Sequence, residues 1–447
     1  MRLQMRSYRR IAVPTLASLA LLAACDVTNP GRVEEEFIAT GDAQQALING
    51  AVRMMSEGMG YGSYSAALLA KEIFPGGQIG AFGHDVTVQG GLLDAGDDLG
   101  HFDPLHQARF IGEVAVKRFT EAGAPADMMY QAHLWTGWAY RVLGEWWCEA
   151  VVGSTDPDDE TPGMHELDTD TYFERAVANF TAALGYASDA DEEFAALAGR
   201  AQAYLWLEQW ANAEADAAAV TDPAFQFVVP YDDLEQAYFN TLYWATAYNP
   251  YASYTMHFTR AKDHYETTGD PRTAVAEDPD EPLAVGSLSG YGPVEFSFPT
   301  KYTSREDDQR LASGWEMRLV EAEAILQQNE ANYPAAMTLI NEVRTRNVSD
   351  IDSTPLAALT AASATEAWEH LRRERAIELF LEGRRMGDLR RWDEMGTPGA
   401  GAWDPPGGYA AWQALSPIFV AESERAVCFD IPDSERESNP NVPEVSG

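Results

Sequence analysis

The stretch "FAALAGRAQAYLWLEQWANAEADAAAV" covers Phe194 to Val220 and contains a clear helical pattern. Its apolar and small residues recur three or four positions apart: Phe194, Leu197, Ala201 and Tyr204, and then Ala213, Ala217 and Val220. This spacing places each set on one face of a helix. The pattern breaks between the two sets, near Glu208 to Ala211. The stretch therefore predicts two amphipathic helices joined by a turn.

The same positions match the pattern of tetratricopeptide (TPR) repeats, with seven of them in register. In such repeats, small residues let paired helices approach closely and aromatic residues fill the gaps. A second pair is predicted from Trp315 to Val343, where Pro334 stands at the start of the second helix and is tolerated. The last pair is expected over Glu366–Glu382 and Arg384–Glu394, with Gly383 as the break.

An earlier and looser helix pair precedes Phe194–Val220 in the sequence. It is carried by small and aromatic residues of two helices: Gly137 and Tyr140, and then Ala176, Phe180 and Ala183. A long acidic segment, "STDPDDETPGMHELDT", separates the two helices. The sequence therefore predicts an all-α fold whose TPR-like helix pairs lie mainly within 130–220 and 315–394.

Three irregular inserts interrupt the helix pairs, at about 74–100, 225–310 and 395–417. Pro, Gly and Tyr become frequent there and the helical periodicity fades. Such inserts are longer than a connection needs, and long irregular segments are often functional. The chain has 447 residues, of which 46% are hydrophobic, so it can bury a sizeable core. We expect 41–447 to form a single α domain.

The N-terminus has the features of an export signal. Basic residues in the first ten positions precede the apolar run Ile11–Ala24, which is too short to span a membrane. The run ends in "LAAC", Leu22 to Cys25, which resembles a bacterial lipobox. This predicts that 1–24 is a lipoprotein signal peptide and that Cys25 carries the lipid anchor. The polar segment 25–40 is expected to be a tether.

Two further cysteines, Cys148 and Cys428, remain in the chain. An oxidising exterior would permit a disulfide between them. Spacing alone does not pair cysteines, and two buried thiols are the alternative.

The charge distribution argues against nucleic-acid binding. The formal net charge is -39, so a phosphate backbone would be repelled. Seven arginines nevertheless lie within Leu371–Trp392. Three glutamates at helical spacing, Glu374, Glu378 and Glu382, would repel one another, and we expect Arg375 and Arg385 to offset them. Arginine also pairs well with carboxylates of neighbouring helices, so this cluster is predicted to be structural.

The same segment, "RRERAIELFLEGRRMGDLRRW", resembles the C-terminal signature of the SusD/RagB family. Segments similar to other parts of that family follow in the family's order: "FDPLHQARFIGEVAVKRF", "AYRVLGEWW", "DPRTA" and "CFDIPDSERESNPNV". Gln107 to Ile111 departs from the family's asparagine-rich form. The residues that carry the signature are Arg373, Glu374, Arg375, Glu378, Glu382, Gly383, Arg385, Asp388, Arg390, Arg391 and Trp392.

The resemblance implies a SusD-like, surface-exposed lipoprotein of the outer membrane. Such a protein binds an oligomeric nutrient, an oligosaccharide or a peptide, and passes it to a SusC-like TonB-dependent β-barrel transporter. It implies no enzymatic activity, no catalytic residue and no cofactor. Acidic residues soon after Cys25 resemble surface-export signals of bacterial lipoproteins, and a plain linker is the alternative.

Aromatic residues in the inserts are the candidates for ligand contact, because sugars stack their apolar faces on aromatic rings. The densest run contains Tyr243, Trp244, Tyr248, Tyr251 and Tyr254. A glycine-rich loop from Phe74 to Asp85 places Phe82, His84 and Asp85 at its tip, and a weaker group contains Trp403 and Tyr409. For each aromatic residue, ordinary core packing is the alternative.

Two other classes of protein are weighed against a binding protein. A TPR scaffold for envelope assembly would not need aromatic inserts. A glycoside hydrolase needs two carboxylates at a defined separation, and 70 acidic residues supply candidates by chance. The acidic group Asp156, Asp158, Asp159 and Glu160 lacks the spacing of a calcium loop, so we predict no metal site.

Overall fold

The computed structural model describes residues 41–76, 84–246, 253–280, 282–284, 294–398 and 403–444. The long helices are α2 (Gly41–Leu69), α4 (Phe102–Ala122), α5 (Ala126–Trp146), α6 (Asp170–Leu184), α7 (Ala190–Trp206), α8 (Trp210–Ala219), α11 (Gly314–Gln328), α12 (Tyr333–Thr345), α13 (Ala364–Glu378) and α14 (Arg385–Glu394). The shorter helices are α3 (Val86–Gly90), α9 (Thr241–Thr246), α10 (Arg260–Thr268), α15 (Tyr409–Leu415) and α16 (Asp433–Ser438).

The strands are short and pair two by two. They are β1 (Phe74–Pro75) with β5 (Tyr254–Thr255), β2 (Ala150–Val152) with β3 (Met164–Glu166), β4 (Gln226–Val229) with β8 (Gln309–Ser313), and β6 (Val275–Ala276) with β7 (Phe298–Pro299). All four pairs are antiparallel. The predicted all-α class is confirmed, since helices dominate the described residues. None of the described helices is both long and apolar enough to cross a membrane.

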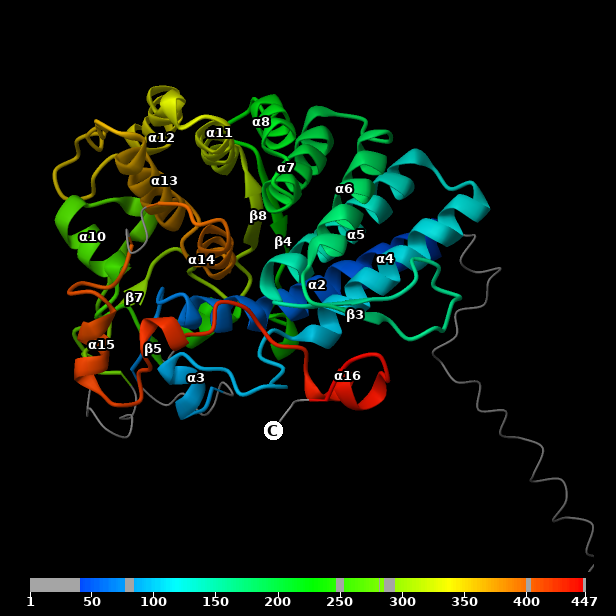
Figure 1. The fold of residues 1–447 in the computed structure, drawn as a ribbon, viewed down its shortest axis with the longest axis horizontal. Helices are drawn as coiled ribbons and strands as arrows, with labels where there is room; N and C mark the ends of the chain where they lie inside the picture. The colour runs from blue at the N-terminus through cyan, green and yellow to red at the C-terminus, as the bar shows by residue number, and fades with distance from the viewer. Residues whose placement is uncertain are drawn as a thin grey trace, which may run out of the picture.

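The helix pairs stack side by side along an arc, as Figure 1 shows. Each helix from α4 to α8 packs on the next, and α11 packs on α12. Helix α8 packs directly on α11, although the insert at 225–310 lies between them in sequence. The insert therefore leaves the stack without breaking it. In the same view, α3, β5 and the C-terminal α16 lie below α2, whereas α10 of the insert at 225–310 lies above it, near α13 (Figure 1).

Phe180 shows why the helix pairs need small residues. Its ring is buried between α5 and α7. A β-carbon added at Gly137 or at Gly199 would lie 2.8 or 2.3 Å from that ring. The two glycines thus allow three helices to close around one aromatic side chain.

The last helix pair differs from the expectation in one respect. We predicted a first helix that ends at Glu382, but α13 ends at Glu378. Leu381 and Gly383 then adopt positive φ values of 56° and 69°. The Leu381 amide donates to the Glu72 carboxylate at 3.1 Å, so a tertiary hydrogen bond replaces a helical one. Glu382 therefore belongs to a turn and not to the helix.

The arginine cluster is buried and joins helices to one another. Arg375 donates two bonds of 2.8 Å to Asp388, and Arg391 binds Glu323 on α11. Arg384 joins Glu145 on α5 to Glu316 on α11, at 3.0 and 2.8 Å. The cluster is thus a framework between helices, built from fork-shaped charge-assisted bonds.

The partners of the three glutamates are not the ones we expected. Arg385 donates to two backbone carbonyls instead of a carboxylate. The cations that pair with Glu374, Glu378 and Glu382 come from other segments of the chain: Arg272, Lys301, Arg310, Arg344 and Arg346. The glutamates are therefore neutralised between elements and not within one helix.

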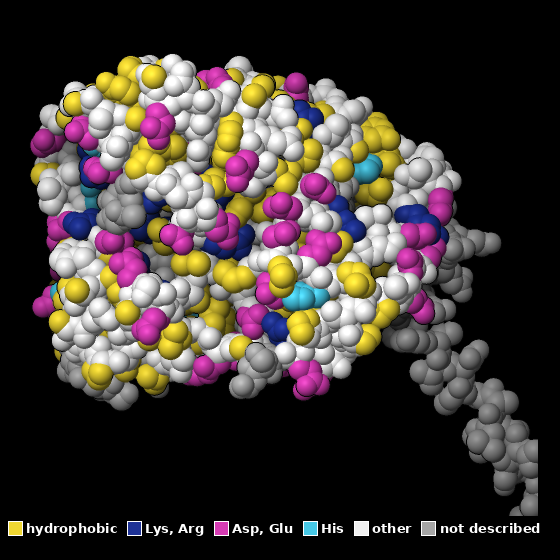
Figure 2. Space-filling view, in the orientation of Figure 1, with side chains coloured by type: hydrophobic (Ala, Val, Ile, Leu, Met, Phe, Trp, Pro, Cys, Tyr) yellow, Lys and Arg dark blue, Asp and Glu magenta, His cyan; other side chains and the backbone are white. Residues whose placement is uncertain are grey.

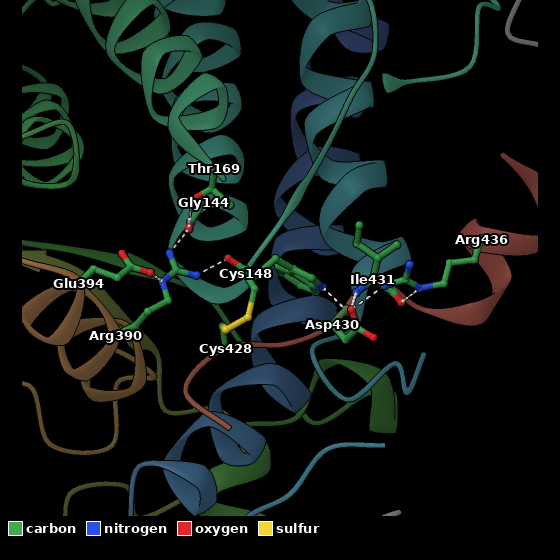
Figure 3. The surroundings of a disulfide bond; sticks show 10 residues. Gly144, Cys148, Thr169, Arg390, Glu394, Cys428, Asp430, Ile431 and Arg436 are labelled. Atoms are coloured by element: carbon green, nitrogen blue, oxygen red, sulfur yellow. Dashed lines mark hydrogen bonds and ion pairs between the residues drawn. A yellow bond between two sulfur atoms is a disulfide. The ribbon is translucent and has the colours of Figure 1, made fainter. Parts of the chain in front are cut away.

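The C-terminal segment 420–442, which we call the strap, ties the inserts to the helix stack. Amides along the strap, from Val420 to Asp433, donate to the carbonyls of Gly90, Gly91 and Gly96. Between Val420 and Asp433, the Phe429 amide donates to the Trp146 carbonyl at 2.7 Å. Cys428 of the strap is bonded to Cys148 after α5, with 5.3 Å between their Cα atoms (Figure 3).

Candidate ligand-binding region

Three inserts meet at one place, beside β1 and β5. Gly76 donates its amide to the Ser253 carbonyl at 2.9 Å, and Ala284 donates to Val294 at the same distance. Thr255 joins two distant parts of the insert at 225–310, because its hydroxyl donates to the carbonyls of Glu295 and Ser297 at 3.0 and 3.1 Å. Backbone and hydroxyl bonds between segments far apart in sequence therefore build this region.

His84 and Tyr254, two of the predicted contact residues, lie in the interior of this region. His84 is 1% exposed and its ring stacks on Tyr64 at 4.4 Å between centroids. Its Nε2 lies 2.9 Å from the Ser65 hydroxyl, and its Nδ1 bonds to the Tyr254 hydroxyl. Burial lowers the pKa of His84 to about 3, so the ring is neutral. Neither ring offers a free face in this arrangement.

Three other predicted residues also have structural contacts. Asp85 caps α3, since its carboxylate accepts the amides of Thr87 and Val88 at 2.8 and 3.0 Å. Trp244 is 9% exposed and meets Phe239 edge to face. Tyr243 is half-buried at the edge of the same cluster. The remaining predicted contacts, Phe82, Tyr248 and Tyr251, lie outside the described residues.

The weaker group is interior as well. Trp403 is buried and its ring meets His264 edge to face. Tyr409 is buried against Trp412 in a small core that also contains Phe74. This small core contains residues of all three inserts and packs them together.

Among the described residues of this region, Phe258 is the exposed large aromatic residue. It is 36% exposed, and its backbone adopts φ 64°, which residues other than glycine rarely do. Its ring packs edge-on against Phe74, and its carbonyl accepts the Trp412 indole N–H at 3.1 Å. A strained backbone that is held by its neighbours often marks a functional site.

Polar side chains stand beside the Phe258 ring. The His257 ring lies 4.0 Å from it, and His257 Nδ1 is 3.6 Å from the Glu295 carboxylate. Burial lowers the pKa of His257, and the Glu295 side chain is largely exposed. A ring face with acceptors at its rim is suited to a ligand that has both apolar faces and hydroxyl groups.

Phe258 was not among the predicted ligand contacts, although it ends the aromatic run that contains Trp244 and Tyr254. Its composition signal is the same as that of Trp244 and Tyr254. Its positive φ and the hydrogen bond from Trp412 to its carbonyl fix the backbone at this position, and neither can be read from the sequence.

The acidic loop before β3 is held by basic residues of α4. Lys117 bonds to Asp156 and Asp158, and Arg118 bonds to Asp158 at 2.9 Å. Within the part of the chain that the structure describes, no group of three or more His, Cys, Asp or Glu side chains is placed to hold a metal ion.

The chain belongs to the SusD family, whose model matches residues 190–447, more than half of its length. No curated protein matches it. Among solved structures, it is similar to a SusD superfamily protein from Bacteroides thetaiotaomicron, with 15% identity, a TM-score of 0.66 and coverage of 91% of this chain and 99% of that one.

Two further solved structures share the fold. One is described as a complex with xylogluco-oligosaccharide, at 15% identity and a TM-score of 0.60, and the match covers 90% of this chain and 100% of the other. The other is surface glycan-binding protein A from Bacteroides uniformis, at 14% identity and a TM-score of 0.64, covering 90% and 99%. At such identities the likeness concerns the fold.

Proposed function

We propose that this protein binds an oligosaccharide at the cell surface and passes it to a SusC-like TonB-dependent β-barrel transporter. The exposed ring of Phe258 at the junction of three inserts is the observation that carries the binding step. Membership of the SusD family and two glycan-related structures of the same fold support the class of ligand.

The chemistry of the junction fits a sugar. A pyranose ring has C–H faces that stack on an aromatic ring and hydroxyls that bond to polar groups at its edge. Phe258 supplies the face, and the exposed Glu295 beside His257 supplies an acceptor. The SusD family is one of binding proteins and not of enzymes, so we assign no catalytic residue.

The location rests on the sequence. The lipobox at Leu22–Cys25 and the polar segment after it favour a lipid anchor followed by a tether. This would hold the binding region outside the outer membrane, next to a barrel transporter. Globomycin treatment, which blocks lipoprotein signal peptidase, should leave the 1–24 segment on the protein.

The binding step is tested by Phe258→Ala, measured by calorimetry against a panel of plant and host oligosaccharides. We expect the affinity for the best ligand to fall about tenfold, the equivalent of about 1.4 kcal/mol. The matched control is Phe110→Ala, which removes an exposed ring from α4; Phe110 is 44% exposed, against 36% for Phe258. Unchanged affinity in the Phe258 variant would remove this ring from the site, and binding of peptides alone would exclude a glycan ligand.

The transport step is tested by a pull-down of the tagged lipoprotein from detergent-solubilised outer membranes. A large β-barrel recovered in stoichiometric amount would support the transporter partnership. Recovery of envelope-assembly factors in place of a barrel would favour a TPR scaffold. Recovery of a barrel without such factors would count against the scaffold.

A further inference from the structure

A hollow lies between α13, α14, the end of α2 and the strap. It has a volume of about 750 Å³, within the range of small-molecule sites, roughly 300–1,000 Å³. Basic side chains are visible between acidic ones in the recess at the middle of the face that Figure 2 shows. The charged residues that line the hollow are three cations and three carboxylates: Lys71, Arg372, Arg425, Asp393, Asp404 and Glu422.

Arg372 is a buried cation without a carboxylate partner among the described residues. It is 6% exposed. Its Nη2 donates to the Thr397 carbonyl and hydroxyl, while its guanidinium lies 4.7 Å from the Trp392 ring centroid. Its Nη1 makes no hydrogen bond to any described residue. Arg375, one turn further along α13, has a carboxylate at 2.8 Å.

Arg425 is the second such cation. It is buried, and its two terminal nitrogens donate to the Leu68 and Leu69 carbonyls and to the Tyr409 hydroxyl. None of these partners carries a formal charge. Burial lowers the pKa of Arg425, and it lowers that of Arg372 to about 10. Three cations and three carboxylates line the hollow, so its formal charges balance, but neither Arg372 nor Arg425 forms an ion pair with a carboxylate among the described residues.

The hollow also contains acceptors. Lys71 bonds to Asp404 at 3.1 Å and to Glu422 at 2.6 Å, and it adopts φ 64°. These two carboxylates are balanced in part by Lys71, and each retains free lone pairs for hydroxyl groups. Apolar surface is supplied by Leu69, Leu389 and Val427.

We propose that this hollow binds a sugar acid, a single ring that carries one carboxylate. Arg372 would donate to the carboxylate through Nη1, and Arg425 would add positive potential. Asp404 and Glu422 would accept hydroxyls, and the apolar side chains would contact the ring. A bare inorganic anion would use the arginine side and be repelled by the carboxylates of Asp393, Asp404 and Glu422, which is why the ring is part of the assignment.

Calorimetry with sodium galacturonate tests the site. We expect saturable binding by the native protein, at least tenfold weaker binding of neutral galactose and of sodium sulfate, and at least a tenfold loss in Arg372→Gln. The matched control is Arg118→Gln, a half-buried arginine of α4 with its own carboxylate partners. The proposal would be overturned if Arg372→Gln bound galacturonate as tightly as the native protein does. It would also be overturned if the native protein showed no binding at millimolar galacturonate.

A second variant keeps the test valid if Arg372→Gln does not fold. Ser423→Phe places a ring at an exposed position of the lining, so it should block entry and leave the core intact. Sulfate that binds as tightly as galacturonate would overturn the assignment to a sugar acid. The hollow is distinct from the oligosaccharide region around Phe258. We therefore expect Phe258→Ala to leave galacturonate binding unchanged.

Discussion

At the scale of the residue, the buried arginines act as clamps between helices. Arg375 is the clearest case, since it is 1% exposed and donates to both carboxylate oxygens of Asp388, through Nε and Nη2. Glu323 lies close by, at 3.7 Å. Removing the cation leaves two buried carboxylates without part of their compensation.

We predict that Arg375→Ala lowers the free energy of unfolding by about 3–5 kcal/mol, the usual cost of breaking a buried ion pair. Urea unfolding followed by tryptophan fluorescence measures it. Arg118→Ala on the surface should cost at most about 1 kcal/mol. A loss of ligand affinity in the Arg375 variant with an unchanged unfolding curve would contradict the structural role.

His84 makes the stability depend on pH. Burial holds its pKa at about 3 in the folded protein, against about 6.5 in an unfolded chain. The unfolded state therefore binds the proton first as the pH falls. The contribution of His84 is fully present above pH 6.5 and is lost progressively between about 6.5 and 3.

We predict that His84→Asn flattens the fall in stability between pH 6 and pH 4, by up to about 1.4 kcal/mol per pH unit. Ser65, Tyr64 and Tyr254, the groups in contact with the ring, carry no charge that could replace it. Unfolding free energies of both proteins across this range give the two slopes. Parallel slopes would show that His84 does not cause the effect.

Residue types were easier to predict than their exposure. The aromatic run named Tyr254, Trp244 and their neighbours as candidates, and the structure places these two inside and Phe258 outside. An aromatic ring favours burial and ligand contact for the same physical reason, so only the packing of other segments distinguishes the two.

At the scale of the element, the sequence predicted the helix pairs closely because their contacts are local. The predicted turn near Glu208 falls between α7 and α8, and Pro334 lies in the first turn of α12. The end of α13 was predicted too late, because Leu381 bonds to Glu72, which is distant in sequence. Periodicity contains no information on such a partner.

The turn after α13 supplies a test at this scale. Gly383 has φ 69°, and a β-carbon there would lie 2.9 Å from the Trp146 ring. Gly396 has a similar φ of 61° but nothing within 4 Å. An alanine at either position would strain the backbone to a similar extent. Only at Gly383 would its β-carbon also be crowded by neighbouring atoms.

We predict that Gly396→Ala destabilises the protein by about 1–2 kcal/mol through backbone strain alone. Gly383→Ala should cost about 1–3 kcal/mol more, because the methyl group overpacks Trp146. Equilibrium unfolding in urea compares them. Equal costs would mean that the Trp146 ring shifts freely to admit the methyl group.

At the scale of the whole molecule, local and distant contacts divide the fold in two. The helix stack is built from neighbours in sequence, and its pattern is legible residue by residue. The ligand region depends on pairings such as β1 with β5, in which Phe74 lies opposite Thr255. Pairs this far apart in sequence leave no periodic signal, so the region could be predicted as three inserts but not assembled.

The strap is what connects the two parts. Arg390 on α14 donates to the Gly144 carbonyl and to that of Trp147, and the Trp147 indole donates to Asp430 of the strap at 3.1 Å (Figure 3). Arg436 holds Asp430 from the other side at 2.7 Å. The disulfide lies within this group of bonds and joins residues 280 positions apart.

We predict that replacing Cys148 and Cys428 by serine lowers the free energy of unfolding by about 2–5 kcal/mol, because the cross-link restricts the unfolded chain over a long loop. The comparison is made with Cys25→Ser as the background, so that no other thiol is present. Dithiothreitol should bring the parent to the stability of the double variant and leave the variant unchanged. A parent that is insensitive to reductant, with two free thiols by mass after alkylation, would show that the strap is held by its hydrogen bonds and by the packing of Phe429 alone.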